Sequence, residues 1–339
     1  MLSKQKSCIA CAQGKRRCDR QTPQCARCRR RGVECLYKDV THLEPSRFSP
    51  LDVDLAFSLM EIPSPYGGSG IFPSLLYPQV VSLDRWSISQ LLRSIKSYPR
   101  LFARHRRTPF IHARLYDDDL PEAIQDAFAV SVAYATKSAE TEDMIFRILE
   151  AKTARLIQQH QDFDRISLSD LLAAVQSLLL FHIIQLFDGD IRQRVIAEQN
   201  ADTLRQWTIQ LQILADEQNH LLTPSTTTWH AWVFAESLRR TVILSILIDG
   251  LFSVLKMGYC TVVPALSLLP FTPEPGLWNA CTDASWLDES SRHSSTVLYG
   301  DFSRAWGEGK IHDRLDSFHK LLLTPCMGEK HRHLLEMKD

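Results

Sequence analysis

The feature that most constrains this chain is a run of closely spaced cysteines near its start. The spacing C-x2-C-x6-C occurs twice end to end, over residues 8–18 and 25–35, and the other three of the nine cysteines stand alone. The six members are Cys8, Cys11, Cys18, Cys25, Cys28 and Cys35. Zinc takes four tetrahedral ligands, so six sulfurs satisfy two ions only if two sulfurs bridge both. The spacing therefore predicts a cluster of two zinc ions.

Two other uses of paired cysteines remain open at this point. A disulfide framework needs an oxidising compartment, and the polar, basic residues 2–6 contain no apolar signal-peptide core. A redox C-x-x-C is expected beside a βαβ pattern, which the sequence does not contain. Structural zinc is the interpretation that the spacing favours.

Basic side chains are concentrated around these cysteines. Residues 1–40 contain eleven Lys or Arg and three acidic side chains, a formal charge of +8. The rest of the chain contains 28 Lys or Arg and 36 Asp or Glu. The net charge of zero is therefore the sum of a basic N-terminal segment and an acidic remainder. Two zinc ions and six thiolates together add −2, which leaves the metal-loaded segment at about +6. Such segregation is typical of proteins that bind a polyanion, and the same side chains can serve nuclear import.

The basic, cysteine-rich segment resembles the fungal zinc binuclear cluster (two zinc, six cysteine) transcription factors. The match covers about residues 8–37 and includes the run Lys15-Arg16-Arg17-Cys18-Asp19 and Pro23. The resemblance implies a small DNA-binding domain of two short helix-loop halves. It also implies that the thiolates of Cys8 and Cys25 bridge two ions, which Cys11 and Cys18, and Cys28 and Cys35, complete.

The same resemblance assigns the DNA contacts. A short helix after Cys11 enters the major groove, where Lys15 reads a CGG triplet through the O6 and N7 acceptors of guanine. Phosphate contacts are assigned to Arg16, Arg17, Arg27, Arg29, Arg30 and Arg31. Ala12 stands where the family usually has a basic residue, which predicts one phosphate contact fewer with zinc binding intact.

The composition divides the chain into four parts. We expect a cluster domain at 1–40, a disordered Pro/Gly-rich linker at 41–82, an all-α regulatory domain at 83–260, and an irregular extension with a final helix at 261–339. Pro45 and Pro50 exclude a coiled coil that begins directly after the cluster, so a homodimer would have to form through the helical domain.

From residue 82 onward the chain has helical periodicity and no alternating strand pattern. We predict a first helix at 83–98 that Pro99 ends, a second reaching about residue 136 with Pro121 in its first turn, and a last one at 302–323. Between them, helices are expected at 140–159, 167–187, 190–216 and 226–256. Residues 171–187 lack charges but contain polar side chains, which favours a buried bundle helix over a membrane span. Glu236, Arg239 and Arg240 are expected to form an ion pair on a helix surface or within the bundle.

Together these features predict a nuclear, sequence-specific regulator of RNA polymerase II transcription. By resemblance it is an activator of a fungal metabolic or secondary-metabolite gene cluster. Its expected partners are double-stranded DNA with GC-rich triplets and the transcription machinery. No residue spacing indicates catalysis, and sulfur would fill every zinc coordination position, so no enzyme activity is expected.

Two alternatives stay open. One is a zinc-stabilised nuclear interaction or RNA-binding protein without sequence-specific DNA readout. The other makes the helical domain an enzyme or a small-molecule receptor, which a pocket with several convergent polar groups would favour.

Overall fold

The structure is a computed structural model. It describes residues 8, 10–11, 16–19, 21, 24–33, 81–160, 166–218, 220, 228–291, 296–310 and 315–328. The chain divides into two compact units, Met1–Ile71 and Phe72–Asp339. We call the described part of the first unit the head and that of the second the body, and treat each separately. Nearly all of the predicted linker at 41–82 lies outside the described residues.

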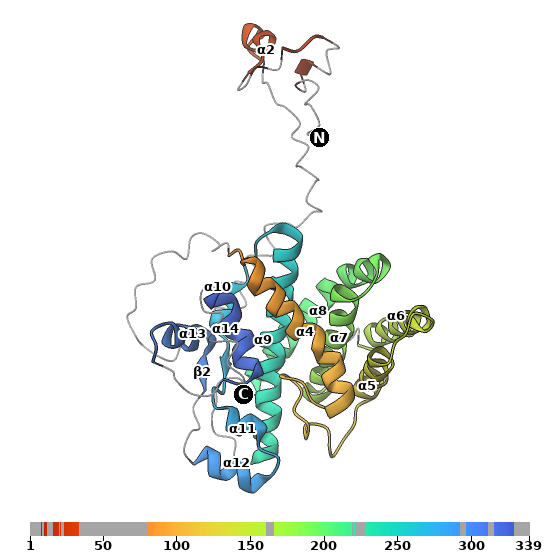
Figure 1. The fold of residues 1–339 in the computed structure, drawn as a ribbon, viewed down its shortest axis with the longest axis vertical. Coiled ribbons are helices and arrows are strands. Elements are labelled where there is room, and N and C mark those ends of the chain that lie inside the picture. The colour runs from red at the N-terminus through yellow and green to blue at the C-terminus, as the bar shows by residue number, and fades with distance from the viewer. Residues whose placement is uncertain are drawn as a thin grey trace. The chain divides into compact units, whose positions relative to one another are not determined.

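The core of the body is organised around α7 (Leu168–Phe187). Every residue of this helix from Leu171 to Phe187 is buried, because α7 packs against α4, α5, α6, α8 and α9 (Figure 1). Among the described residues, α7 is the one helix long and apolar enough to span a membrane, with a mean hydropathy of 1.7. Since 89% of its most apolar window is buried inside the body, α7 has the burial expected of a core helix.

Apart from the end of α4, the neighbours of α7 begin and end close to the predicted residues. They are α4 (Arg85–His105), α5 (Glu122–Ala135), α6 (Glu142–Gln159), α8 (Ile191–Glu217) and α9 (Trp229–Met257). Four of the helices α4–α9 have side-chain caps at their starts: Asp84, Ser167, Asp190 and Thr228 each accept a hydrogen bond from a backbone N–H of the first turn. Pro121 precedes α5 as its N-cap residue and lies outside the first turn.

The prediction that Pro99 ends the first helix is wrong. Helix α4 continues through Pro99 to His105. A proline inside a helix costs about 3 kcal/mol because it removes a hydrogen bond and crowds the preceding turn. Burial of the stripe Leu91, Ile95, Tyr98 and Phe102 spans the proline on both sides and outweighs that cost.

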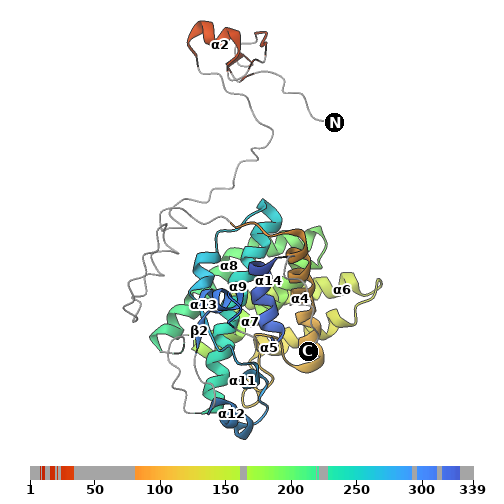
Figure 2. The ribbon, with the colours of Figure 1, turned by 60° about the vertical axis from the view of Figure 1, so that its left-hand side comes forward.

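Helix α9 connects the α4–α8 bundle to the C-terminal elements. It contacts α7 and α8 on one side and α10, α12 and β1 on the other, and Figures 1 and 2 show it running through the body. The C-terminal elements are α10 (Val263–Ser267), β1 (Pro270–Phe271), α11 (Pro275–Asn279), α12 (Asp283–Ser290), β2 (Val297–Leu298), α13 (Tyr299–Gly307) and α14 (Ser317–Met327). The strands β1 and β2 pair antiparallel, with Phe271 opposite Val297.

The predicted single helix at 302–323 is two helices. Helix α13 ends at Gly307, and Gly309 follows with a φ of +69°, which glycine adopts at little cost. Helix α14 begins directly after its N-cap residue Asp316. A carboxylate oxygen of Asp316 accepts a hydrogen bond from the backbone N–H of His319. Phe318 of α14 belongs to the main core, and α14 packs on α4. The all-α class predicted for the second part of the chain is confirmed, with one two-stranded ribbon among its described residues.

Candidate metal centre and nucleic-acid interface

Four cysteine sulfurs meet in the head. Cys8, Cys11, Cys25 and Cys28 are all buried, and their Sγ atoms lie within 4.8 Å of one another. Three distances define the arrangement: 3.8 Å between Cys8 and Cys25, 3.7 Å between Cys8 and Cys28, and 3.7 Å between Cys11 and Cys25. Cys8 and Cys25 are therefore neighbours of each other. Each also has one further sulfur at 3.7 Å, that of Cys28 beside Cys8 and that of Cys11 beside Cys25.

These distances agree with zinc coordination. A Zn–S bond of about 2.3 Å at tetrahedral angles places two sulfurs about 3.8 Å apart. A disulfide would require about 2.05 Å, so none of the three pairs is bonded. Four buried thiols at this separation form a donor set that suits a thiophilic metal, and Ala10 and Cys18 pack against them. The cysteine residues present thus fit zinc.

The second half of the head is built by α2 (Ala26–Arg31). Cys25 caps this helix, since its Sγ accepts a hydrogen bond from the backbone N–H of Cys28 at 3.4 Å. Both carboxylate oxygens of Asp19 lie within reach of the Ala26 N–H, at 3.1 and 3.2 Å. Gly32 ends the helix with a φ of 59°. Asp19 therefore ties the segment that contains Cys18 to the start of α2.

The two remaining predicted ligands differ in what the structure describes. Cys18 is partly exposed, and its sulfur lies within 4.8 Å of the Cys25 sulfur and of an Asp19 oxygen. Cys35 lies outside the described residues, as does Lys15, to which base reading was assigned. The structure thus brings five of the six predicted cysteines into one neighbourhood.

Arg27 differs from the other arginines of the head. It is half-buried, and its Nη1 lies 3.7 Å from the Sγ of Cys11. A cluster of two zinc ions and six thiolates has a formal charge of −2, which a neighbouring guanidinium offsets. Arg27 therefore directs its charge to the sulfur cluster, in addition to any contact with phosphate.

The other predicted phosphate-binding side chains point their charge to solvent. Arg16, Arg17, Arg29, Arg30 and Arg31 are all exposed. Three of them form the last turn of α2, where the negative end of the helix dipole favours cations. The described head therefore presents five unburied guanidinium groups around a metal-binding core, a surface suited to a phosphate backbone.

A basic surface on a compact cysteine cluster, together with a separate helical body, defines a zinc-dependent nucleic-acid-binding regulator. Residues 6–42 match the family described as "Fungal Zn(2)-Cys(6) binuclear cluster domain". The chain is 31% identical over 390 aligned residues to Transcription factor gsfR2 of Penicillium aethiopicum, with 95% of this chain and 92% of that protein covered. No solved structure matches the chain.

The chain belongs to the fungal Zn(2)-Cys(6) family of transcription factors. It is a zinc-binding, DNA-binding transcription regulator, as the cysteine spacing and the resemblance predicted. The family is one of regulators rather than enzymes, which agrees with the expectation that no catalysis occurs.

Two features of the head were not foreseen from the sequence. One is the hydrogen bond from Ala26 to Asp19, and the other is the contact of Arg27 with sulfur. The N-cap position of α2 is occupied by Cys25, so the capping rule gives no sequence signal for the more distant Asp19. The Arg27 contact depends on the fold of the head, and a basic residue inside a cysteine pair carries no separate signal for it.

Proposed function

We propose that this protein is a nuclear activator that reads CGG-type triplets through a two-zinc head. Cys8 and Cys25 would bridge the ions, Cys11 and Cys18 would complete one site, and Cys28 and Cys35 the other. The observation that supports the two-ion part of the proposal is a fifth sulfur, that of Cys18, which lies within 4.8 Å of the Cys25 sulfur. One tetrahedral ion takes only four sulfurs, so a fifth beside them favours a second ion.

In the proposed complex, Lys15 donates to guanine, while the exposed arginines of the head bind phosphates. Arg16, Arg17, Arg29, Arg30 and Arg31 hold the head on the duplex, and Arg27 divides its charge between sulfur and phosphate. Lysine donates from a single point, which suits the two adjacent acceptors on the major-groove edge of guanine. Zinc orders the segments that display these side chains, and every ligand position is filled by sulfur, so it performs no chemistry.

The finer parts of the proposal rest on the family. Members commonly activate metabolic or secondary-metabolite gene clusters, and we propose the same process, in the nucleus, with recruitment of the transcription machinery. A homodimer formed by the body would supply the affinity that one short recognition helix lacks. Exposed apolar side chains on α5, α6 and α8 are available for it: Phe128, Val132, Met144, Ile148, Ile191 and Val195.

Duplex binding by the zinc-loaded full-length protein tests the proposal. We expect CGG-containing DNA to bind more tightly than scrambled DNA, and Lys15→Ala to remove about 1–3 kcal/mol of that preference. Arg30→Ala should weaken binding to both duplexes and reduce the salt slope by about one. Arg93→Ala, an exposed arginine of α4, is the matched control and should change neither. Equal, salt-sensitive binding to both duplexes, or to RNA, would favour the interaction-protein alternative instead.

A further inference from the structure

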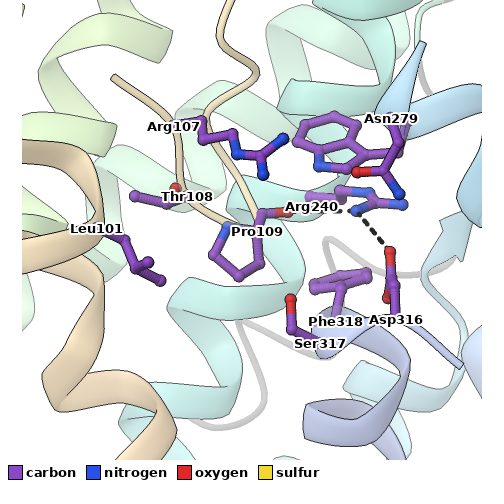
Figure 3. Close-up of a pocket in the computed structure, with 10 residues that line it drawn as sticks. Leu101, Arg107, Thr108, Pro109, Arg240, Asn279, Asp316, Ser317 and Phe318 are labelled. Atoms are coloured by element: carbon purple, nitrogen blue, oxygen red, sulfur yellow. Dashed lines mark hydrogen bonds and ion pairs between the residues drawn. The ribbon is translucent and has the colours of Figure 1, made fainter. Parts of the chain in front are cut away.

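Arginine side chains that are buried in the body have carboxylate partners. The sequence predicted an ion pair of Glu236 with Arg239 and Arg240, and the structure places all three inside the body, with side-chain exposures of 0, 3 and 0%. Glu236 accepts hydrogen bonds from Arg239 Nε at 2.9 Å and Arg240 Nε at 2.8 Å. Figure 3 shows that Asp316 also faces Arg240, at 4.0 Å. A guanidinium withdrawn from water needs such an anion, because an uncompensated buried charge is strongly destabilising.

Arg27 is the arginine of the described head that is partly withdrawn from water. It is half-buried, whereas the other described arginines of the head are exposed. Among the described residues no carboxylate lies within ion-pair distance of its guanidinium, and the carboxylate of Asp19 accepts from the backbone N–H of Ala26 instead. The Nη1 of Arg27 lies 3.7 Å from the Sγ of Cys11, which is fully buried. In the zinc-loaded head the anionic partner of Arg27 is therefore the Cys11 thiolate.

The contact between Arg27 and Cys11 joins the two halves of the head. Arg27 belongs to α2, in the second half, and Cys11 lies 16 residues earlier, in the first half. The backbone of α2 is itself fixed to the sulfurs, because Cys25 is its N-cap residue and Cys28 lies in its first turn. Arg27 stands between these two cysteines in the sequence, so the cluster holds the backbone of Arg27 beside the sulfurs.

The charge of the sulfur cluster strengthens this contact. Two zinc ions and six thiolates have a formal charge of −2, and buried sulfurs such as that of Cys11 are weakly screened by water. A guanidinium stays protonated in proteins, and a hydrogen bond that involves charged groups is about twice as strong as a neutral one. Cysteine holds a metal as the thiolate, so a neighbouring group that stabilises the thiolate favours the metal-bound form.

We propose that Arg27 retains zinc in the head: its guanidinium stabilises the Cys11 thiolate and slows the loss of the ion that Cys11 holds. The inference rests on the proposed zinc cluster and gives Arg27 a role that contact with phosphate does not require. Arg27 acts through Cys11, so it is a positioning residue and not a ligand. Helix α2 then has two functions, because Arg27 contacts sulfur while Arg29, Arg30 and Arg31 are exposed to solvent.

The experiment measures zinc release from the full-length, zinc-loaded protein to the coloured chelator pyridylazoresorcinol. We expect Arg27→Ala to release zinc about tenfold faster, because it removes a hydrogen bond between charged groups. Arg27→Lys keeps the charge and should stay within about threefold of the unmodified rate. Arg29→Ala is the matched control, since it removes an exposed arginine of the same helix, and its release rate should not change. An unchanged rate in Arg27→Ala, or an equal acceleration in Arg29→Ala, would overturn the proposal.

Cobalt in place of zinc tests the contact with sulfur directly. A thiolate-bound cobalt(II) ion has an absorption band from electron transfer between sulfur and metal, and hydrogen bonds to the thiolate tune its energy. Loss of the Arg27 hydrogen bond raises the energy of the thiolate electrons, so Arg27→Ala should shift the band of the cobalt-loaded, full-length protein to longer wavelength. Arg29→Ala should leave the band in place. A band that stays in place in Arg27→Ala would contradict the proposal, and Arg27→Gln provides the same test if Arg27→Ala holds no cobalt.

Two further measurements separate this inference from the proposed function. The zinc content of the unmodified protein tests the cluster, and a count of one ion per chain would contradict the bridged cluster whatever the effect of Arg27→Ala. Two ions per chain with a release rate that does not depend on Arg27 would overturn the retention role and leave the cluster in place. DNA binding should show the reverse dependence, because Arg29→Ala should reduce the salt slope by about one while its zinc release stays the same.

Discussion

The head and the body of this chain keep their folds in different ways. In the described head, the buried cluster consists of Cys8, Cys11, Cys25 and Cys28, with no large aliphatic or aromatic side chain among its members. The body buries a continuous apolar core around α7 that extends from Leu91 to Leu323. Burial of apolar surface can stabilise the body without any metal, whereas the head has too little of it to fold alone.

The comparison teaches that one chain can contain a part whose fold depends on metal and a part whose fold does not. Their responses can be separated in a single sample. All seven tryptophans of the sequence lie between Trp86 and Trp306, so tryptophan fluorescence reports on the body alone. Zinc content and DNA binding report on the head. Each prediction below changes one part and follows both.

Metal removal should produce the largest difference. Binding of structural zinc contributes on the order of 10 kcal/mol to a small domain, so a strong chelator should unfold the head and abolish DNA binding. The urea midpoint measured by tryptophan fluorescence should not move. A body that unfolds at lower urea after chelation would show that its core depends on the metal, against this account.

Phe181→Ala should have the opposite pattern. Phe181 is 1% exposed at the centre of α7, and loss of such a ring from a packed core costs about 3–5 kcal/mol. We expect a lower urea midpoint for the body with unchanged zinc content. Leu287→Ala is the control, since Leu287 is 53% exposed and its truncation should stay within about 0.5 kcal/mol.

Two ion pairs with the same N–O distance sharpen the comparison between buried and exposed charge within the body. Glu236 and Arg240 lie 2.8 Å apart with both side chains fully buried, while Glu198 and Lys256 lie 2.8 Å apart in solvent. Glu236→Gln leaves two buried arginines without their counter-charge and should cost about 3–5 kcal/mol. Glu198→Gln should cost no more than about 1 kcal/mol. Equal losses in urea denaturation would show that burial does not set the strength of these pairs.

Lowering the pH should reduce the free energy of unfolding of the body, because the body contains buried histidines. Burial lowers the pKa of His182 to about 4, and mainly burial lowers that of His112 to about 4. The unfolded chain takes up a proton near pH 6.5, so stability falls as pH drops from about 6.5 to about 4, by at most about 3 kcal/mol for each histidine. His182→Leu should remove about half of this loss in fluorescence-detected urea unfolding. His230→Leu, at an exposed position, should leave the pH dependence unchanged.

Most helices of the body follow from periodicity and caps that can be read in the sequence. The start of α7 is an example, because Ser167 and Asp170 supply a capping pattern directly before an apolar run. The error at Pro99 has a physical reason: a local rule for proline was applied where burial of Tyr98 and Phe102 on either side of it outweighs the local cost. Local rules fail where long-range packing is stronger.

The metal site was more predictable than the buried charges of the body. Cysteine spacing is a local signal, and the structure brings together sulfurs that lie within about twenty residues of one another in the sequence. Arg240 lies 4.0 Å from Asp316, which is far away in the sequence, so no local pattern marks that contact. The charge of Arg240 was visible in the sequence, but its burial and its unpaired Nη2 appear only in the fold.

Zinc content per full-length chain, measured on purified protein with the head cysteines reduced, tests the central claim most directly. The repeated C-x2-C-x6-C spacing predicts two zinc ions per chain, held by six sulfurs. Cys25→Ser removes a bridging ligand and should bring the count below two, while Cys281→Ser, an exposed cysteine of the body, should leave it at two. A count of one zinc in the unmodified protein would contradict the bridged cluster.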